Sequence, residues 1–121
     1  SDRDLEDEEV NFADLSGIYV AEDIKKKDVV GYISFSQKPE KDEWYGKHIY
    51  LFEFGVSKKY RGKGIGSRMI NKLLSHCKKR KLNVKVDTLV NNKSTIKLYK
   101  KLGFKPLMTY FIKDNKKRLR L

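Results

Sequence analysis

The segment YRGKGIGS, residues 60–67, decides the fold because it joins two stretches of different periodicity. Before it, the run HIYLFEFGV at residues 48–56 is rich in aromatic and β-branched residues, which is typical of a central strand. After it, apolar residues recur at the spacing of one helix face: Ile65, Met69, Ile70, Leu73, Leu74 and Cys77. The segment is therefore predicted to be a glycine-rich turn between a strand and a helix.

A strand-to-helix turn of this composition favours an anionic ligand. Unpaired N–H groups and the positive end of the helix dipole meet there. Glycines let the backbone approach a ligand without a Cβ, and basic side chains add charge-assisted hydrogen bonds. Taken alone, such a turn is more often a plain tight turn. We expect it to hold a diphosphate through seven consecutive residues: Arg61, Gly62, Lys63, Gly64, Ile65, Gly66 and Ser67.

Two common nucleotide-binding motifs do not fit this segment. A Walker loop needs a glycine, four residues and then Gly-Lys-Ser/Thr, and no glycine in the chain meets that spacing. The dinucleotide motif needs Gly-x-Gly-x-x-Gly, but Ser67 stands where the third glycine would follow Gly64. The diphosphate must therefore belong to another class of ligand.

A second motif lies farther along the chain, in NNKSTIKLYKKLGF at residues 91–104. Asn91 and Asn92 offer a helix cap, apolar residues follow at helical spacing, and Gly103 ends the helix. Together with Arg-x-x-Gly-x-Gly at residues 61–66, this motif makes the chain resemble the GNAT superfamily of acetyl-CoA-dependent N-acetyltransferases. The residues that match the family's later signature are Asn92, Leu98, Tyr99, Lys101, Gly103 and Phe104.

The resemblance covers residues 17–121 and implies an α/β (α+β) fold. It implies a mixed, mostly antiparallel sheet flanked by helices, with a central splayed parallel strand pair at residues 48–56 and 82–90. The sequence pattern places further elements around this pair. They are a hairpin at 18–35, a loop at 37–47, a strand at 104–112, a turn at 114–115 and an edge strand at 118–121. The acidic lead-in segment 1–16 is expected to be a tail or a short helix before the domain at 17–121.

The resemblance also implies that acetyl-CoA binds as co-substrate in the cleft between the two parallel strands. Its amide-rich pantetheine arm would pair like an added strand with Phe54, Gly55 and Val56. Asn92 would hydrogen-bond the arm from the other side, and Lys101 would reach the same molecule. A main-chain N–H near Val56 would stabilise the oxyanion of the reaction. No metal is expected.

Two side chains are candidates for proton transfer. Tyr99 fits a core tyrosine on periodicity alone, but its place in the family pattern implies that it protonates the departing thiolate. Glu53 is the lone acid of the apolar run at 48–56, so it could carry a raised pKa and accept the amine proton directly or through water. A surface carboxylate paired with a lysine is an equal alternative for Glu53. His48 and Asp87 are weaker candidates for the base.

The charge of the chain divides into two parts of opposite sign. Residues 1–23 carry nine acids and one base, a net charge of −8, and the other 98 residues carry 27 bases and 7 acids, a net charge of +20. A segment as basic as residues 24–121 should attract polyanions. The alternative to an enzyme is therefore a non-catalytic module on the same scaffold that binds nucleic acid, the ribosome or another acidic partner. The intact motif residues favour the enzyme.

The composition indicates a folded protein and restricts the disulfides, metal sites and membrane segments that the chain can form. The aromatic content of 12% is too high for a disordered chain. The single Cys77 excludes an internal disulfide, and Cys77 with His48 and His76 cannot form a Cys/His zinc cluster. We expect a cytoplasmic protein with no membrane association, because no apolar run reaches the roughly 18–20 residues of a membrane span and the acidic start is unlike a signal peptide.

The sequence leaves several explanations open for how the acceptor site is formed. Members of the resembled family normally begin with a strand and one or two helices that wall the acceptor site, and residues 1–16 are too few to supply them. Three explanations stay open: a truncated or divergent domain, a homodimer in which a neighbouring chain completes the wall, or a wall formed by the acidic segment itself. The expected reaction is acetyl transfer to a primary amine of a protein, a peptide or a small molecule.

Overall fold

The structure is a computed structural model that describes residues 10–15 and 17–118, with the backbone alone for 10–15. It divides into two compact units, residues 1–86 and 87–121, and each is described by itself. The first unit contains, in order, β1 (Val10–Leu15), β2 (Ile18–Asp23), β3 (Asp28–Phe35), β4 (Glu40–Asp42), β5 (Gly46–Val56), the short 3-10 helix η2 (Lys58–Tyr60), α1 (Ile65–Lys79) and β6 (Asn83–Lys85).

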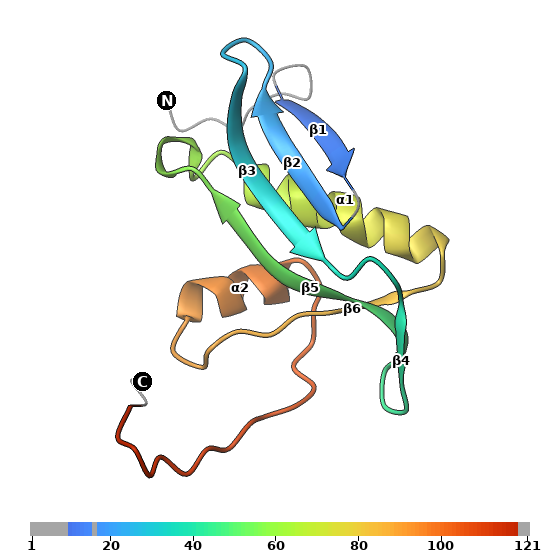
Figure 1. Ribbon diagram of the computed structural model, residues 1–121, viewed down its shortest axis with the longest axis vertical. Helices are drawn as coiled ribbons and strands as arrows, with labels where there is room; N and C mark the ends of the chain where they lie inside the picture. Colours follow the sequence, from blue (N-terminus) through green and yellow to red (C-terminus); the bar gives the residue numbers. More distant parts are fainter. Residues whose placement is uncertain (1–9, 16, 119–121) are drawn as a thin grey trace. The chain divides into compact units, whose positions relative to one another are not determined.

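The strands of the first unit form one mixed sheet, drawn in Figure 1. Their order is β1-β2-β3-β5-β4, and β6 pairs with β5. All neighbouring strands are antiparallel except β5 and β6, which run parallel. This topology confirms the predicted fold class: a mostly antiparallel sheet that contains a parallel strand pair and packs against a helix.

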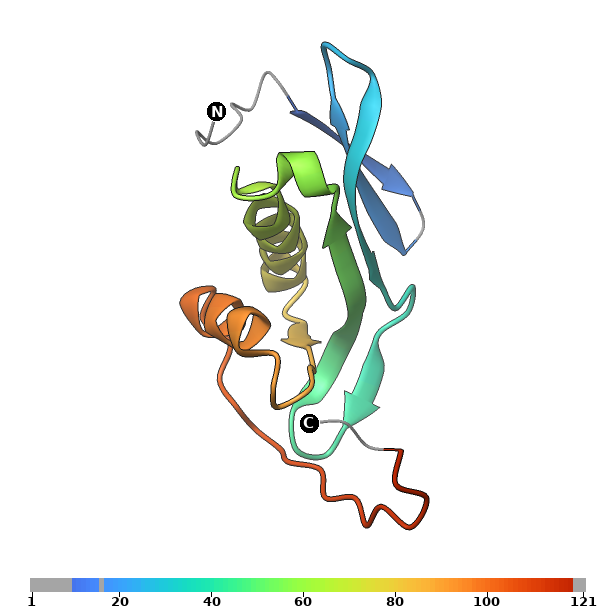
Figure 2. The same ribbon diagram turned by 90° about the vertical axis from the view of Figure 1, so that its left-hand side faces the viewer.

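The helix α1 covers one face of the sheet, as Figure 2 shows edge-on. Its buried face contains the predicted apolar residues Ile65, Met69, Ile70, Leu73 and Cys77. A Cβ at Gly31 of β3 would lie only 3.0 Å from Cε of Met69. Glycine at this position therefore lets the helix approach the sheet closely, which holds the start of α1 next to the end of β5.

A register shift in β5 changes which side chains face the helix. Ser34 pairs with Glu53, whereas the next residue, Phe35, pairs with Leu51, so Phe52 has no counterpart on β3. Ser34 and Phe35 are neighbours on β3 and therefore point to opposite faces of the sheet. Their partners Glu53 and Leu51 share these faces, so Leu51 and Glu53 also lie on opposite faces. Leu51 is buried at 2% exposure, and Glu53 is exposed. A strict alternation would have placed both residues on one face.

The parallel pair is much shorter than predicted. The sequence pattern predicts a strand over residues 82–90, but only Asn83–Lys85 form β6. Pairing runs from His48 with Asn83 to Tyr50 with Lys85, and the rest of β5 continues along β3. The two parallel strands therefore share a ladder only at their beginnings, which agrees with the splayed pair that the sequence resemblance implied.

Two other predictions for the first unit are wrong. The described part of the lead-in segment is neither a tail nor a helix, because β1 pairs along its whole length with β2. The spacing of its apolar residues at 10, 12, 13 and 15 is compatible with either a helix or a strand. The segment forms a strand because it pairs with β2 at the edge of the hairpin. Residues 1–9 and 16 lie outside the described residues. The predicted loop 37–47 contains β4, which pairs with the first residues of β5.

The second unit contains the helix α2 (Lys93–Lys101). Asn92 is its N-cap, and Gly103 follows with a left-handed φ of 96°, so both predicted helix ends are confirmed. The predicted turn at 114–115 is confirmed too, since the Asp114 carboxylate accepts hydrogen bonds from the N–H groups of Lys116 and Arg118. None of the helices in the described part of the chain is long and apolar enough to cross a membrane.

The predicted strand at 104–112 is absent from the described residues. The run is extended and highly exposed, with Tyr110 at 84% and Phe111 at 92% exposure. Its composition favours a strand, but a strand forms only where another strand pairs with its N–H and C=O groups. The predicted edge strand at 118–121 lies outside the described residues except for Arg118, which belongs to no strand.

Candidate functional site

The glycine turn leaves the first N–H groups of α1 without a side-chain cap. Gly64 is the N-cap with φ 82° and ψ 5°, it makes no side-chain cap hydrogen bond, and the first turn holds no acidic residue. Gly62 has φ 77°, also in the left-handed region that favours glycine. The N–H groups of Ile65, Gly66 and Ser67 are thus the unsatisfied donors that an anion would meet at the positive end of the helix.

The end of β5 presents main-chain groups beside this turn. The N–H of Ser57 donates to the carbonyl oxygen of Val30 at 2.8 Å, so residues 57, 55 and 53 form the hydrogen-bonded pairs with β3. The N–H and C=O of Val56 therefore point away from β3. The guanidinium of Arg61 donates through Nε to the Val56 carbonyl oxygen at 3.0 Å. Arg61 is thus placed between the end of β5 and the glycine turn.

A buried hydrogen bond holds the beginning of the turn. The hydroxyl of Tyr60, the last residue of η2, donates to Oδ2 of Asp23 at 2.8 Å, and the two residues are 6% and 8% exposed. The other oxygen of Asp23 accepts from the N–H groups of Lys25 and Lys26 at 3.0 and 3.2 Å. The Tyr60 hydroxyl and the Lys26 N–H lower the pKa of Asp23, and the Asp23 carboxylate raises the pKa of Tyr60 to about 12.

The lowered pKa of Asp23 makes stability depend on pH. An unfolded aspartate titrates near a pKa of about 3.9, so the stabilisation from Asp23 is complete above that pH. It is lost as the pH falls through the lower pKa of the folded state. We predict that the wild-type protein loses more free energy of unfolding than Asp23→Asn between pH 7 and about pH 3, measured by urea denaturation. Equal losses in the two proteins would contradict a charged, hydrogen-bonded Asp23.

The candidate base Glu53 lies on the face of the sheet away from α1 and is exposed. Tyr32 of β3 lies on the same face, and a Cβ at Gly55 would come within 2.7 Å of its ring. The ring of Tyr32 therefore rests on the backbone at Gly55, and a side chain at residue 55 would force this ring to move. The structure thus brings Glu53, Phe54, Gly55 and Val56 together at the end of β5, with the glycine turn next along the chain.

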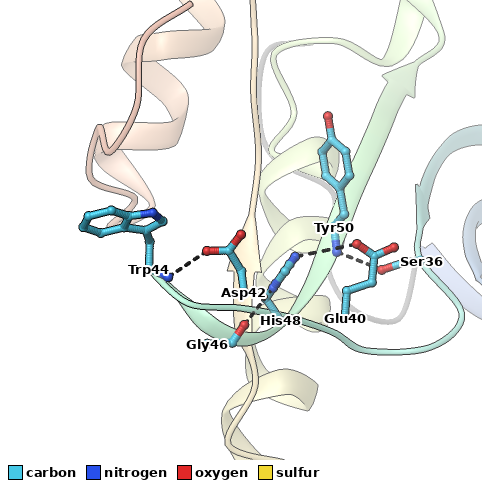
Figure 3. A network of polar contacts seen from close by, with 7 residues as sticks. All are labelled: Ser36, Glu40, Asp42, Trp44, Gly46, His48 and Tyr50. Carbon is cyan, nitrogen blue, oxygen red and sulfur yellow. Dashed lines mark hydrogen bonds and ion pairs between the residues drawn. The ribbon is translucent and has the colours of Figure 1, made fainter.

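His48 has a structural position in the β4–β5 hairpin, which Figure 3 shows. It is 3% exposed, its Nδ1 lies 2.9 Å from the carbonyl oxygen of Gly46, and its ring packs edge-on against Tyr45. Its Nε2 lies 4.0 Å from a carboxylate oxygen of the exposed Glu40. The same hairpin is held by the bond from the Trp44 N–H to the Asp42 carboxylate. These contacts account for His48 without a catalytic role.

The remaining predicted residues belong to the second unit. The side-chain oxygen of Asn92 caps α2 by accepting from the Thr95 N–H at 3.3 Å. Tyr99 is half-buried and its ring packs against Phe104 at a centroid distance of 5.4 Å. Burial, and then the negative charge of Asp87, raise the pKa of Tyr99, so its hydroxyl keeps its proton at neutral pH. Lys101 ends α2 and is exposed.

Sequence reasoning missed the roles of Asp23, Tyr60 and Tyr32. Asp23 and Tyr60 are 37 residues apart, and nothing in their spacing predicts that they meet. One signal was present: Asp23 is an acid at the start of the basic turn IKKKD, residues 24–28. An aspartate at the end of a strand often accepts hydrogen bonds from the N–H groups of the following turn.

Comparisons with known proteins identify the family of the chain. A family model for the acetyltransferase (GNAT) family matches residues 1–104. The spermine/spermidine N(1)-acetyltransferase of Bacillus subtilis is 32% identical over 84 residues, which cover 64% of this chain and 53% of that protein. The thialysine N-epsilon-acetyltransferase of Sus scrofa is 39% identical over 69 residues, which cover 53% of this chain and 38% of that protein. The chain thus spans about half, or less, of the length of these two relatives.

Solved structures show the same fold. Arabidopsis thaliana Naa50, in complex with the bisubstrate analogue CoA-Ac-MVNAL, superposes with a TM-score of 0.62 at 33% identity over 74% of this chain and 58% of that one. A protein from Pyrococcus furiosus superposes with a TM-score of 0.70 at 23% identity over 79% of this chain and 63% of that one. Since the family model spans most of the sequence, the chain belongs to the GNAT acetyltransferase family.

Proposed function

We propose that this protein is an N-acetyltransferase that moves an acetyl group from acetyl-CoA to a primary amine within a ternary complex. The uncapped start of α1 at Ile65, which follows the outward-pointing main chain of Val56 after η2 and the glycine turn, is the observation that carries the proposal. Acetyl-CoA carries a diphosphate at one end of its pantetheine arm and a thioester carbonyl at the other, and these two sets of donors suit the two groups. The CoA-containing analogue in the related Naa50 structure supports the choice of co-substrate.

In this proposal each group has one task. The N–H groups at residues 62–67, with Arg61 and Lys63, hold the diphosphate. The amine nitrogen attacks the thioester carbon, and the Val56 N–H donates to the oxygen as it becomes negative. The carbon–sulfur bond then breaks, and the Tyr99 hydroxyl gives its proton to the thiolate. Glu53 takes the proton that the amine loses, directly or through water, so the products are the N-acetylated amine and CoA with a free thiol.

The acceptor class is a primary amine, the group shared by the substrates that the relatives' names give: spermine, spermidine and thialysine. The exposed Glu53 agrees with such an acceptor, because an exposed carboxylate attracts an ammonium group and is itself open to water. We place the acceptor on the face of the sheet that carries Glu53 and Tyr32, opposite α1. A peptide amine and a small amino compound both fit this chemistry.

The decisive experiment measures release of the CoA thiol from acetyl-CoA with a panel of acceptors: spermidine, lysine, thialysine and short peptides with a free N-terminus. We expect acceptor-dependent thiol release and, with acetyl-CoA alone, a rise in melting temperature. Thiol release that is equal without an acceptor would indicate hydrolysis only. An unchanged melting temperature with acetyl-CoA, together with RNA binding that weakens steeply with salt, would instead support the non-catalytic module.

A further inference from the structure

The hairpin formed by β2 and β3 holds the beginning of the glycine turn from the side. Tyr60 reaches back 37 residues to donate to Asp23, the last residue of β2, at 2.8 Å. The residues between β5 and η2 are tied to the same hairpin, since the Ser57 N–H donates to the Val30 carbonyl of β3 at 2.8 Å. Within η2, the Tyr60 N–H donates to the Ser57 carbonyl at 2.9 Å. The start of the turn is therefore fixed at two points on one hairpin.

The turn that follows β2 fixes Asp23 independently of its hydrogen bond with Tyr60. One carboxylate oxygen accepts from the N–H groups of Lys25 and Lys26, and the Asp23 carbonyl oxygen accepts from the Lys27 N–H at 2.8 Å. Lys27 adopts a left-handed φ of 57° to close this turn. The second carboxylate oxygen is thus aimed at Tyr60 by the turn that follows β2, and both side chains are buried.

Directly after Tyr60 the turn is held at Arg61, whose N–H donates to the Lys58 carbonyl oxygen at 3.3 Å and whose Nε–H donates to the Val56 carbonyl oxygen at 3.0 Å. Arg61 and Gly62 are exposed, and a Cβ built on Gly62 would meet no atom within 4 Å. A flexible loop loses conformational freedom when it binds a ligand, and a loop held in its bound shape loses less. We expect the segments at the two ends of the turn, Tyr60 on one side and α1 on the other, to contribute to the order of the diphosphate-binding residues.

We propose that the Asp23–Tyr60 hydrogen bond positions the glycine turn for the diphosphate of CoA, so that it sets affinity for the co-substrate without entering the chemical step. The inference rests on the proposed function for its ligand. Tyr60 and Asp23 touch neither the thioester nor the acceptor in this scheme. Their effect reaches the ligand through the main chain of residues 61–64.

The test compares two donors in wild-type protein and Tyr60→Phe, which removes one hydroxyl and keeps the ring. Acetyl-CoA carries the diphosphate, and S-acetylpantetheine carries the same thioester arm without it. We expect the KM for acetyl-CoA to rise about 10-fold, the kcat at saturation to stay within about twofold, and kcat/KM for S-acetylpantetheine to stay unchanged. A merely structural role would lower the activity with both donors equally, and that result would overturn the proposal.

Calorimetric binding of CoA separates this inference from the proposed function. If the wild-type protein does not bind CoA, the proposed function fails. If it binds CoA and Tyr60→Phe binds it equally well, only the positioning role fails. Asp23→Asn, which keeps an oxygen for the Tyr60 hydroxyl, should raise the Kd for CoA less than Tyr60→Phe does, and a larger rise would contradict the proposal. Tyr110→Phe, at an 84% exposed tyrosine, is the matched control and should leave the Kd unchanged.

Discussion

Replacing Tyr99 with phenylalanine should lower kcat by about 100-fold or more while the affinity for acetyl-CoA stays within about threefold. General acids contribute about 10²- to 10⁴-fold to enzymatic rates, and the variant removes only the hydroxyl that would protonate the thiolate. The raised pKa of Tyr99 keeps that proton in place at neutral pH. The ring of phenylalanine can keep the packing against Phe104, so a loss of turnover would not come from a disordered α2.

Steady-state kinetics with a saturating amine and calorimetric binding of CoA would check this expectation. Tyr110→Phe, which removes a hydroxyl from an exposed tyrosine, should retain wild-type turnover. A kcat for Tyr99→Phe equal to that of Tyr110→Phe would mean that Tyr99 only packs. A parallel fall in kcat and in CoA affinity would instead assign Tyr99 to binding.

The fold could be predicted where the signal was local. The strand β5 and the helices α1 and α2 follow from periodicity, caps and glycines within each segment. The errors concern segments whose state depends on pairing. Residues 10–15 form a strand because β2 offers an edge, whereas residues 104–112, with better strand composition, pair with no strand among the described residues. Composition gives only the tendency of a segment to form a strand, and whether the strand forms depends on a neighbouring strand with which it can pair.

The site could be predicted in part for the same reason. The glycine turn is contiguous, so its residue types and its place before α1 could be recognised together. The face occupied by Glu53 could not, because the register shift at Phe52 reverses the alternation of β5. The Asp23–Tyr60 contact joins residues 37 apart and exists only because the hairpin folds beside η2. The role of a residue can be predicted only with the three-dimensional structure when that role depends on a bulge or on a contact between residues far apart in the sequence.

Gly64→Ala should weaken acetyl-CoA binding or the folded state, and the two losses together should reach about 1–2 kcal/mol. Gly64 has φ 82°, and a residue with a Cβ costs about 1–2 kcal/mol in that conformation. If the turn keeps its shape, the cost appears as a lower free energy of unfolding. If the turn relaxes, the cost appears on binding as a Kd about 5- to 30-fold higher, since about 1.4 kcal/mol corresponds to tenfold.

Gly66→Ala is the matched control, because it adds the same methyl group two residues later without the same strain. Gly66 is inside α1, and its added Cβ would lie 3.7 Å from the side chains of Phe54 and Val56, an ordinary contact. Alanine also favours the helix over glycine by up to about 1 kcal/mol. We expect unchanged or higher stability and a Kd for acetyl-CoA within about threefold, since the N–H at residue 66 is retained. Equal behaviour of the two variants would show that the left-handed backbone at Gly64 does not matter for the diphosphate site.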